Sequence, residues 1–243
     1  QNQTICESTV IVEDTSPPYP ACDGLTKVAL DANGKGRIFA TTFDDGSTDN
    51  CGIASFKARK MTDLCGFGLA YGDYVDFCCA ELGQTIMVAL EVTDHYGNKN
   101  TCMVEVKVED KLKPTLNCPP DITLACTDNY DFTQLDIYGT VVTEPNKVKD
   151  IIIQNDYHSG KVGTDGLAKD NCTVTVASSY KTDINCHTGF IYRTFVATDA
   201  NGLKDSCTQK ITILNPDPFD SFDIKWPNNY SADGCKLSQT SPD

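Results

Sequence analysis

The sequence predicts an all-β fold of tandem β-sandwiches stapled by disulfides, and three observations support this prediction. Apolar residues alternate with polar ones on both sides of a turn rich in Asp, Asn and Gly, which is typical of a β-hairpin. The hairpin occurs twice, at residues 91–110 and 195–215. Many of the 13 cysteines stand at matching places in the two copies, as disulfide-forming residues do.

The hairpin also defines a repeat. Asp199 in the second copy matches Asp94 in the first, and Cys207 matches Cys102. A partial copy at the N-terminus places Cys6 where Cys102 stands, so the repeat measures 96 residues at its first step and 105 at its second. Immunoglobulin-like sandwiches have this length. We therefore predict two complete immunoglobulin-like domains with partial copies at both ends.

The predicted domain limits follow proline-containing junctions. Residues 1–14 match the last strand of a preceding repeat, 15–110 and 111–215 are complete repeats, and 216–243 begin a following repeat. Because proline cannot continue a central strand, each junction is interpreted as a linker or a strand start. The partial copies fit a cropped chain, a cleaved chain, or repeats completed by neighbouring chains.

Composition narrows the class of protein. The net charge of −14 and the pI near 4.5 disfavour nucleic acid as a partner. No apolar run approaches the ~20 residues of a bilayer-spanning helix. Many cysteines without a C-x-x-C pair favour disulfides over a zinc ribbon and indicate an oxidising compartment. We expect an extracellular or cell-surface protein without a membrane span.

Catalytic signatures are missing from the sequence. The three histidines, His95, His158 and His187, have no metal-binding spacing, and no G-x-S-x-G, P-loop or G-x-G-x-x-G motif occurs. The cysteines repeat with the fold, which is expected of disulfides and not of a catalytic nucleophile. We therefore predict that the chain is not an enzyme.

Several motifs occur together in this chain. They are a D-N-C loop, a T-D-x-x-G turn, a cysteine that opens the last strand, a V-x-V-x-D strand end and the stretch C-P-P-D-I-T. The combination closely resembles the hyalin-repeat-like modules of giant surface proteins from Bacteroidota, which are similar to immunoglobulin-like sandwiches. Those proteins include gliding adhesins, stalks and filaments that are commonly exported by type IX secretion.

The resemblance implies a structural or adhesive repeat module of a secreted or cell-surface bacterial protein, which forms an extended stalk or an extracellular filament. The expected partners are neighbouring repeats or identical subunits. The alternative is a carbohydrate- or protein-binding module, in which the variable loops 60–83 and 127–169 recognise a surface glycan or a protein ligand.

The strand order of such a sandwich predicts which cysteines meet. The D-N-C loop and the tip of the last hairpin lie at one pole, whereas the first strand ends and the penultimate strand begins at the other. The predicted disulfides are Cys22–Cys79, Cys51–Cys102, Cys65–Cys78, Cys126–Cys186 and Cys172–Cys207. Which of Cys78 and Cys79 takes the long-range bond is left open. Cys6, Cys118 and Cys235 are expected to be unpaired or bonded between repeats.

Carboxylate and amide side chains are predicted to gather at the pole of the D-N-C loop. The predicted set is Asp14, Asp44, Asp49, Asn50 and Asp94 for the first copy and Asp110, Asp165, Asp170, Asn171 and Asp199 for the second. Hard oxygen ligands from a linker and two loops suit calcium, which takes six to eight oxygens in flexible geometry. The alternative is that these residues only form turns and cap backbone groups, since the EF-hand spacing is absent from both copies.

Overall fold

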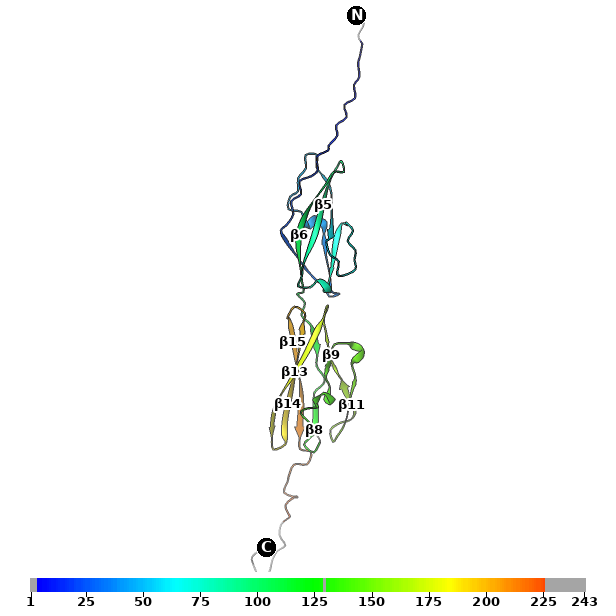
Figure 1. The fold of residues 1–243 in the computed structure, drawn as a ribbon. Helices are drawn as coiled ribbons and strands as arrows, with labels where there is room; N and C mark the ends of the chain where they lie inside the picture. The colour runs from blue at the N-terminus through cyan, green and yellow to red at the C-terminus, as the bar shows by residue number, and fades with distance from the viewer. Residues whose placement is uncertain (1–3, 129, 226–243) are drawn as a thin grey trace, which may run out of the picture.

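The computed structural model describes residues 4–128 and 130–225, which form two β-sandwiches placed end to end (Figure 1). Residues 4–14 extend from the outer end of the first sandwich, and residues 216–225 extend from the outer end of the second (Figure 1). The described residues contain no α-helix, only short 3₁₀-helices: η1 (Ala40–Phe43), η2 (Cys79–Glu81), η3 (Leu135–Tyr138) and η4 (Pro145–Lys147). The predicted all-β class is confirmed.

The first sandwich packs a four-stranded sheet against a two-stranded one. The larger sheet has the order β1-β6-β5-β3, and β2 pairs with β4 in the smaller sheet. The strands are β1 (Leu25–Ala29), β2 (Lys35–Phe39), β3 (Ile53–Lys60), β4 (Tyr74–Cys78), β5 (Thr85–Asp94) and β6 (Lys99–Glu109). One apolar core joins the two sheets, because Phe77 of β4 packs with the buried residues of β5 and β6.

The hairpin of β5 and β6 supplies the centre of this core, as its alternating pattern predicts. Six of its side chains are fully buried: Val88, Leu90, Val92, Val104, Val106 and Val108. Val88 lies opposite Val104 in the antiparallel register. Burial of one such side chain contributes about 1.5 to 3 kcal/mol. A slip of one residue would expose the whole set, so the alternation fixes the register.

The second sandwich repeats the large sheet and enlarges the side that packs against it. The order β13-β14-β15-β8 matches β3-β5-β6-β1, and β7-β12-β9 and β10-β11 form two further sheets. The strands are β7 (Thr115–Asn117), β8 (Ile122–Ala125), β9 (Val141–Val142), β10 (Asp150–Gln154), β11 (Ser159–Thr164), β12 (Gly166–Lys169), β13 (Val174–Asn185), β14 (Thr188–Asp199) and β15 (Lys204–Leu214). The longer middle at residues 127–169 therefore contains β9 to β12.

In both sandwiches an early strand pairs in parallel with the last one, β1 with β6 in the first and β8 with β15 in the second. Leu25 of β1 lies opposite Glu105 of β6, and Ile122 of β8 lies opposite Ile211 of β15. Because the paired strands start at the same pole, residues at equal distances before these pairs also lie side by side. This register determines two of the disulfides.

Four disulfides link the described residues: Cys22–Cys102, Cys65–Cys78, Cys79–Cys172 and Cys118–Cys207. Cys22 and Cys102 each stand three residues before the first opposed pair, and Cys118 and Cys207 each stand four residues before the second. These two bonds are therefore equivalent. Cys79, at the far pole of the first sandwich, bonds instead to the D-N-C loop of the second.

The structure corrects four of the predicted disulfides. The predicted pairs Cys22–Cys79 and Cys51–Cys102 are wrong, because Cys22 precedes β1 and so lies beside the start of β6, where it bonds to Cys102. The predicted pair Cys172–Cys207 is wrong for the equivalent reason, because Cys118 precedes β8 and bonds to Cys207. The predicted Cys126–Cys186 bond is also not formed, since Cys126 follows β8, whereas Cys186 lies in the turn between β13 and β14, and β15 separates these elements in the sheet. Cys118, expected to lack a partner, bonds to Cys207, whereas Cys65 bonds to Cys78 as predicted.

Four cysteines have no disulfide partner among the described residues: Cys6, Cys51, Cys126 and Cys186. Cys235 lies outside the described residues. Residues 4–14 carry the alternation of β6, yet they pair with no strand in residues 4–128 or 130–225. Their apolar side chains are exposed, with Val10 at 81% and Val12 at 77%. The assignment of both chain ends to further repeats stays a prediction.

Candidate metal centres at one pole of each sandwich

Two groups of three aspartates lie at corresponding poles of the two sandwiches. The N-terminal cluster contains Asp14, Asp49 and Asp94, and the joint cluster contains Asp110, Asp170 and Asp199. In each group, one carboxylate oxygen per residue lies within 4.8 Å of the other two. The members come from the segment that leads into the sandwich, from the D-N-C loop and from the turn of the last hairpin. The sequence predicted all six residues.

Each aspartate is positioned by its own local turn, in which one carboxylate oxygen accepts a backbone N–H two residues later. The Oδ1 of Asp110 accepts from the N–H of Leu112 at 2.9 Å, and Oδ2 of Asp170 accepts from the N–H of Cys172 at 2.9 Å. The Oδ1 of Asp199 accepts from two N–H groups in the hairpin turn. The N-terminal cluster repeats these bonds: Ser16 to Asp14, Cys51 to Asp49, and Tyr96 and Asn98 to Asp94. The Asx geometry therefore comes from the sequence on each turn.

The second oxygen of each joint-cluster aspartate has no such partner. Oδ2 of Asp110, Oδ1 of Asp170 and Oδ2 of Asp199 are buried and accept no hydrogen bond. Asp110 is 1% exposed and Asp199 is 6% exposed. A buried carboxylate oxygen without a donor is costly, and three of them in one place also repel one another.

The N-terminal cluster is partly satisfied within the chain. Oδ2 of Asp14 and Oδ1 of Asp49 are buried and unpartnered, but Oδ2 of Asp94 accepts a hydrogen bond from the side-chain amide of Asn98 at 2.8 Å. The corresponding position in the second sandwich is Leu203, which has no such donor. In both clusters an asparagine of the hairpin turn donates to the backbone carbonyl of the leading aspartate, Asn98 to Asp14 and Asn201 to Asp110.

The ionisation of the carboxylates differs between the clusters. Burial raises the pKa of Asp170, and the neighbouring charges of Asp110 and Asp199 raise it further. Burial acts on Asp94 in the same direction, but hydrogen bonds from Asn98 and from the turn outweigh it and lower the pKa of Asp94. The N–H of Ser16 and the amide of Asn50 lower the pKa of Asp14.

The four remaining residues of the predicted set do not belong to either group of three. Asp44 accepts the N–H groups of Ser47 and Gly46 within its own loop. Asp165 accepts the N–H groups of Thr140 and Lys149 and lies in the variable loop region. Asn50 donates to Asp14 at 3.2 Å, and Asn171 donates to the carbonyl of Asp31 in the first sandwich at 3.0 Å.

The disulfide across the joint between the sandwiches was not predicted. Cys79 and Cys172 join the far pole of the first sandwich to the D-N-C loop of the second, and Asn171 adds a hydrogen bond. Gly34 has a left-handed φ of +69°, and a Cβ there would clash with Sγ of Cys79 and lie 2.7 Å from the carbonyl oxygen of Asn171. The backbones therefore meet at van der Waals contact.

One sequence signal for the two aspartate clusters was missed. Asp14 and Asp110 are each followed four residues later by a buried proline, Pro18 and Pro114, and eight residues later by the cysteine of the long-range disulfide. This shared spacing marks the two segments as equivalent connectors. By contrast, no sequence signal identifies the Cys79–Cys172 partnership, because it depends on how two domains stack.

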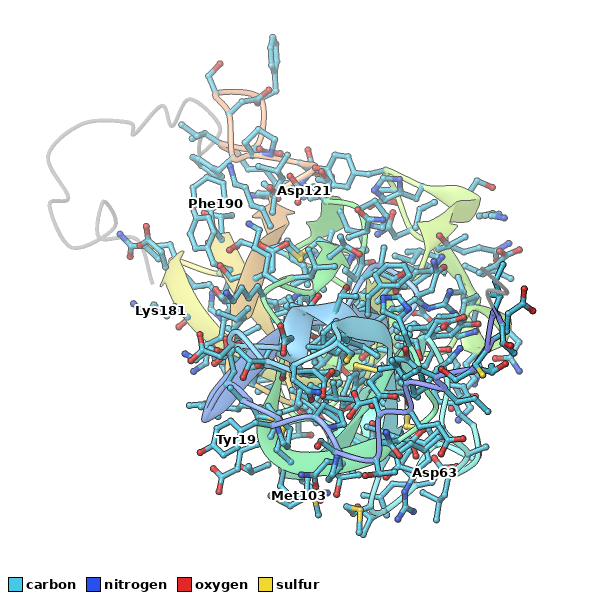
Figure 2. All side chains as sticks on the ribbon, turned by 90° about the horizontal axis from the view of Figure 1, so that it is seen from above. Tyr19, Asp63, Met103, Asp121, Lys181 and Phe190 are labelled. Carbon is cyan, nitrogen blue, oxygen red and sulfur yellow. A yellow bond between two sulfur atoms is a disulfide. The ribbon has the colours of Figure 1, made fainter. Side chains whose placement is uncertain are left out.

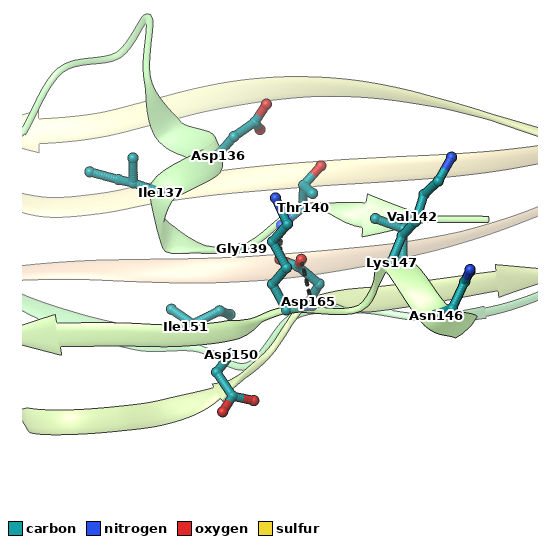
Figure 3. A pocket seen from close by; sticks show the side chains of 11 residues that line it. Asp136, Ile137, Gly139, Thr140, Val142, Asn146, Lys147, Asp150, Ile151 and Asp165 are labelled. Carbon is teal, nitrogen blue, oxygen red and sulfur yellow. Dashed lines mark hydrogen bonds between the residues drawn. The ribbon is translucent and has the colours of Figure 1, made fainter. Parts of the chain in front are cut away.

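An open groove of about 640 Å³ lies in the variable loop region of the second sandwich. It is lined by residues from η3, η4 and β10, including Asp136, Lys147 and Asp150 (Figure 3). Figure 3 shows Asp165 near the middle of this lining, where hydrogen bonds from backbone N–H groups hold its carboxylate.

In the view down the long axis, exposed side chains such as Tyr19 and Lys181 lie on the outside of the molecule (Figure 2).

Comparisons with known proteins found similarity only to solved structures, at low sequence identity. No protein-family profile matches it, and no curated protein matches it. Among solved structures, it is similar to the N-terminal four Ig domains of Dscam1 isoform 6.9, with 8% identity, a TM-score of 0.35 and coverage of 84% of this chain and 48% of that one. It is also similar to the PKD domain of the KIAA 1837 protein (16%, TM-score 0.29, coverage 43% and 98%).

A third similar structure is the insect immune protein hemolin, with 11% identity, a TM-score of 0.29 and coverage of 86% of this chain and 49% of that one. The chain thus spans about half the length of the Dscam1 and hemolin structures. The immunoglobulin-like sandwich fold with disulfide staples is established by the sheet order and the bonds of this chain. None of the helices in residues 4–128 and 130–225 has the length and apolar character needed to cross a membrane.

Proposed function

We propose that the chain is a structural or adhesive repeat module of a secreted bacterial surface protein, in which sandwiches stacked end to end form an extended stalk or extracellular filament. The disulfides support an extracellular location, since such bonds persist in oxidising compartments. The bacterial source and the type IX secretion route in this proposal rest on the sequence motifs alone.

The observation that carries the proposal is the covalent path along the long axis. A force applied at the two ends passes through the Cys22–Cys102 bond and then through the Cys118–Cys207 bond. From the first bond to the second, the force is carried by the backbone of residues 102–118. The loops closed by these disulfides, with sequence separations of 80 and 89, are bypassed.

The joint adds a second restraint. Cys79 and Cys172 connect the sandwiches beside the linker, so two covalent connections run from one sandwich to the next. An inter-domain connection of this kind resists bending, whereas a single flexible linker permits it. A module that has to transmit force or hold a fixed length would gain from both features.

Single-molecule force spectroscopy tests this proposal. We expect the oxidised chain, pulled from its ends, to resist without releasing either closed loop. The double variant Cys22→Ser with Cys102→Ser should release the first sandwich only, in a single long extension. Equal extension of the two proteins would contradict the proposed mechanical role.

A second candidate function is a binding module, and two observations favour it. The groove at residues 127–169 carries both acidic and basic side chains. The other variable loop, at residues 60–83, exposes the apolar residues Leu64 and Phe67 at 51% and 46%. A glycan and protein array separates the two functions, because a ligand that is lost in a Lys147→Ala variant and retained in a Lys181→Ala variant would establish binding at the groove.

A further inference from the structure

We propose that the joint cluster and the N-terminal cluster each bind a calcium ion. The ligands are one carboxylate from the segment that leads into the sandwich, one from the D-N-C loop and one from the hairpin turn. This inference concerns ion binding alone and does not rest on the mechanical role proposed above.

The unpartnered oxygens of the joint cluster carry the inference. Asp110 and Asp199 are more than nine-tenths buried, and each has one oxygen without a donor. Both belong to a group in which one carboxylate oxygen per residue lies within 4.8 Å of the other two. A turn-forming aspartate uses one oxygen for the backbone and leaves the other in water. Here the other oxygen is buried. The turn therefore explains the hydrogen bonds of one oxygen of each carboxylate and leaves the other oxygen without a partner.

The recurrence of the arrangement is independent support. The N-terminal cluster contains the same three positions, held by the same turns, with two of its three carboxylates again presenting a buried unpartnered oxygen. The two sandwiches differ in their central segments, and yet both place three aspartates in the same arrangement. Core packing does not require it, because the clusters lie at the poles and outside the apolar cores.

The chemistry of the donors selects the ion. All three side chains in each cluster supply oxygen, which suits hard cations and not zinc or copper. The ligands come from three separate segments with unequal hydrogen bonding, which suits the flexible coordination of calcium better than the strict octahedron of magnesium. Water molecules would complete the six to eight ligands that calcium takes.

The two sites should differ in affinity. In the N-terminal cluster, Oδ2 of Asp94 already accepts a hydrogen bond from the amide of Asn98. Binding of an ion there should therefore be less favourable in free energy. In the joint cluster all three carboxylates have an unpartnered oxygen. We therefore expect the joint cluster to fill first.

Ion binding at the joint would act on the same loop as the disulfide. Asp170 and Cys172 are two residues apart, and Cys172 is bonded to the first sandwich while Asp170 faces Asp110 of the linker. An ion held by Asp110 and Asp170 would fix the linker to the loop that the disulfide already anchors.

Isothermal titration calorimetry with calcium chloride, on the oxidised chain after removal of metals with EDTA, tests the inference. We expect two binding events per chain, one for each cluster, and a rise in Tm on adding calcium. The variant Asp199→Asn should lose the tighter event and Asp94→Asn the weaker one. The control variant Asp44→Asn removes the same charge from the same kind of loop and should keep both.

Two further measurements keep the outcome decisive. Asp170 is only partly buried, so Asp170→Asn should fold even where Asp199→Asn does not, and it too should lose the tighter event. Magnesium chloride should give a weaker response than calcium chloride. Absence of heat and of any Tm change in the unmodified chain, unchanged binding in Asp170→Asn, or equal responses to both metals would overturn the proposal.

Discussion

Cys79 of the first sandwich and Cys172 of the second are joined by a disulfide that bridges 93 residues of sequence, with their Cα atoms 5.4 Å apart. Each sandwich also has its own long-range bond, Cys22–Cys102 in the first and Cys118–Cys207 in the second. The joint bond can therefore be removed while both folds stay cross-linked, which makes its contribution measurable.

Removal of the joint bond should loosen the two sandwiches relative to each other. In the double variant Cys79→Ser with Cys172→Ser, small-angle X-ray scattering should show a wider range of inter-domain orientations, because only the linker and weaker contacts remain. The control is Cys65→Ser with Cys78→Ser, which removes a bond of sequence separation 13 inside the first sandwich. A scattering curve that changes in the control and not in the joint variant would contradict the role assigned to Cys79.

The close approach at Gly34 predicts a sensitive position. Gly34→Ala should destabilise the joint by about 1 to 3 kcal/mol, since a Cβ would clash with Cys79 and the backbone of Asn171. Gly46 has a comparable left-handed φ of +90° but open space around it, so Gly46→Ala measures backbone strain alone. Peptide mapping of the Cys79–Cys172 bond and thermal unfolding of both variants provide the comparison. Equal behaviour would show that contact at Gly34 is unimportant.

A buried ion pair stabilises the first sandwich near its variable loop. Nζ of Lys60 lies 2.6 Å from Oε1 of Glu81, and the two side chains are 2% and 0% exposed. Glu81→Gln should cost about 3 kcal/mol in chemical denaturation, at the low end for breaking a buried pair, because buried Lys60 keeps only the more distant carboxylate of Asp63, at 3.5 Å. The exposed pair Lys147–Glu144, also at 2.6 Å, is the control, and Glu144→Gln should cost about 1 kcal/mol or less. Similar losses in both variants would contradict the importance of burial.

Acid should open one turn of the variable loop 60–83 at a defined pH. The pKa of Asp63 is about 2, below its ordinary value of 3.8. The hydrogen bond from the N–H of Gly68 lowers it most, and the N–H of Cys65 lowers it further, whereas burial raises it. Because the folded pKa is depressed, the stabilisation is fully present above about pH 3.8 and is lost as the pH falls through about 2. An NMR titration of the Gly68 amide should show its midpoint near pH 2. A midpoint near 3.8 would show that these hydrogen bonds do not form in solution.

The hairpins were predictable because alternation of apolar residues reports directly on a half-buried strand. Val104, Val106 and Val108 therefore indicated both the strand and its buried face. The six clustered aspartates were also predictable, since Asp94 and Asp199 occupy the same place in a recurring turn. Asp44 and Asp165 resemble them in sequence, but their carboxylates are used by nearby backbone N–H groups.

The disulfides were less predictable because they depend on register and on domain stacking. Cys22 meets Cys102 only because β1 runs parallel to β6 with Leu25 opposite Glu105. That offset leaves no trace in the alternation of either strand. The partner of Cys79 lies in another domain, so it could not be found from the strand order of one sandwich.

The force path through Cys22–Cys102 and Cys118–Cys207 is the central claim, and force spectroscopy on the oxidised and the reduced chain tests it most directly. Reduction should allow each sandwich to release its closed loop, which corresponds to roughly 270 to 300 Å of contour length at about 3.4 Å per residue. The oxidised chain should show no extension of this length at any force that leaves the disulfides intact. Extensions of the full loop length in the oxidised chain would contradict the account.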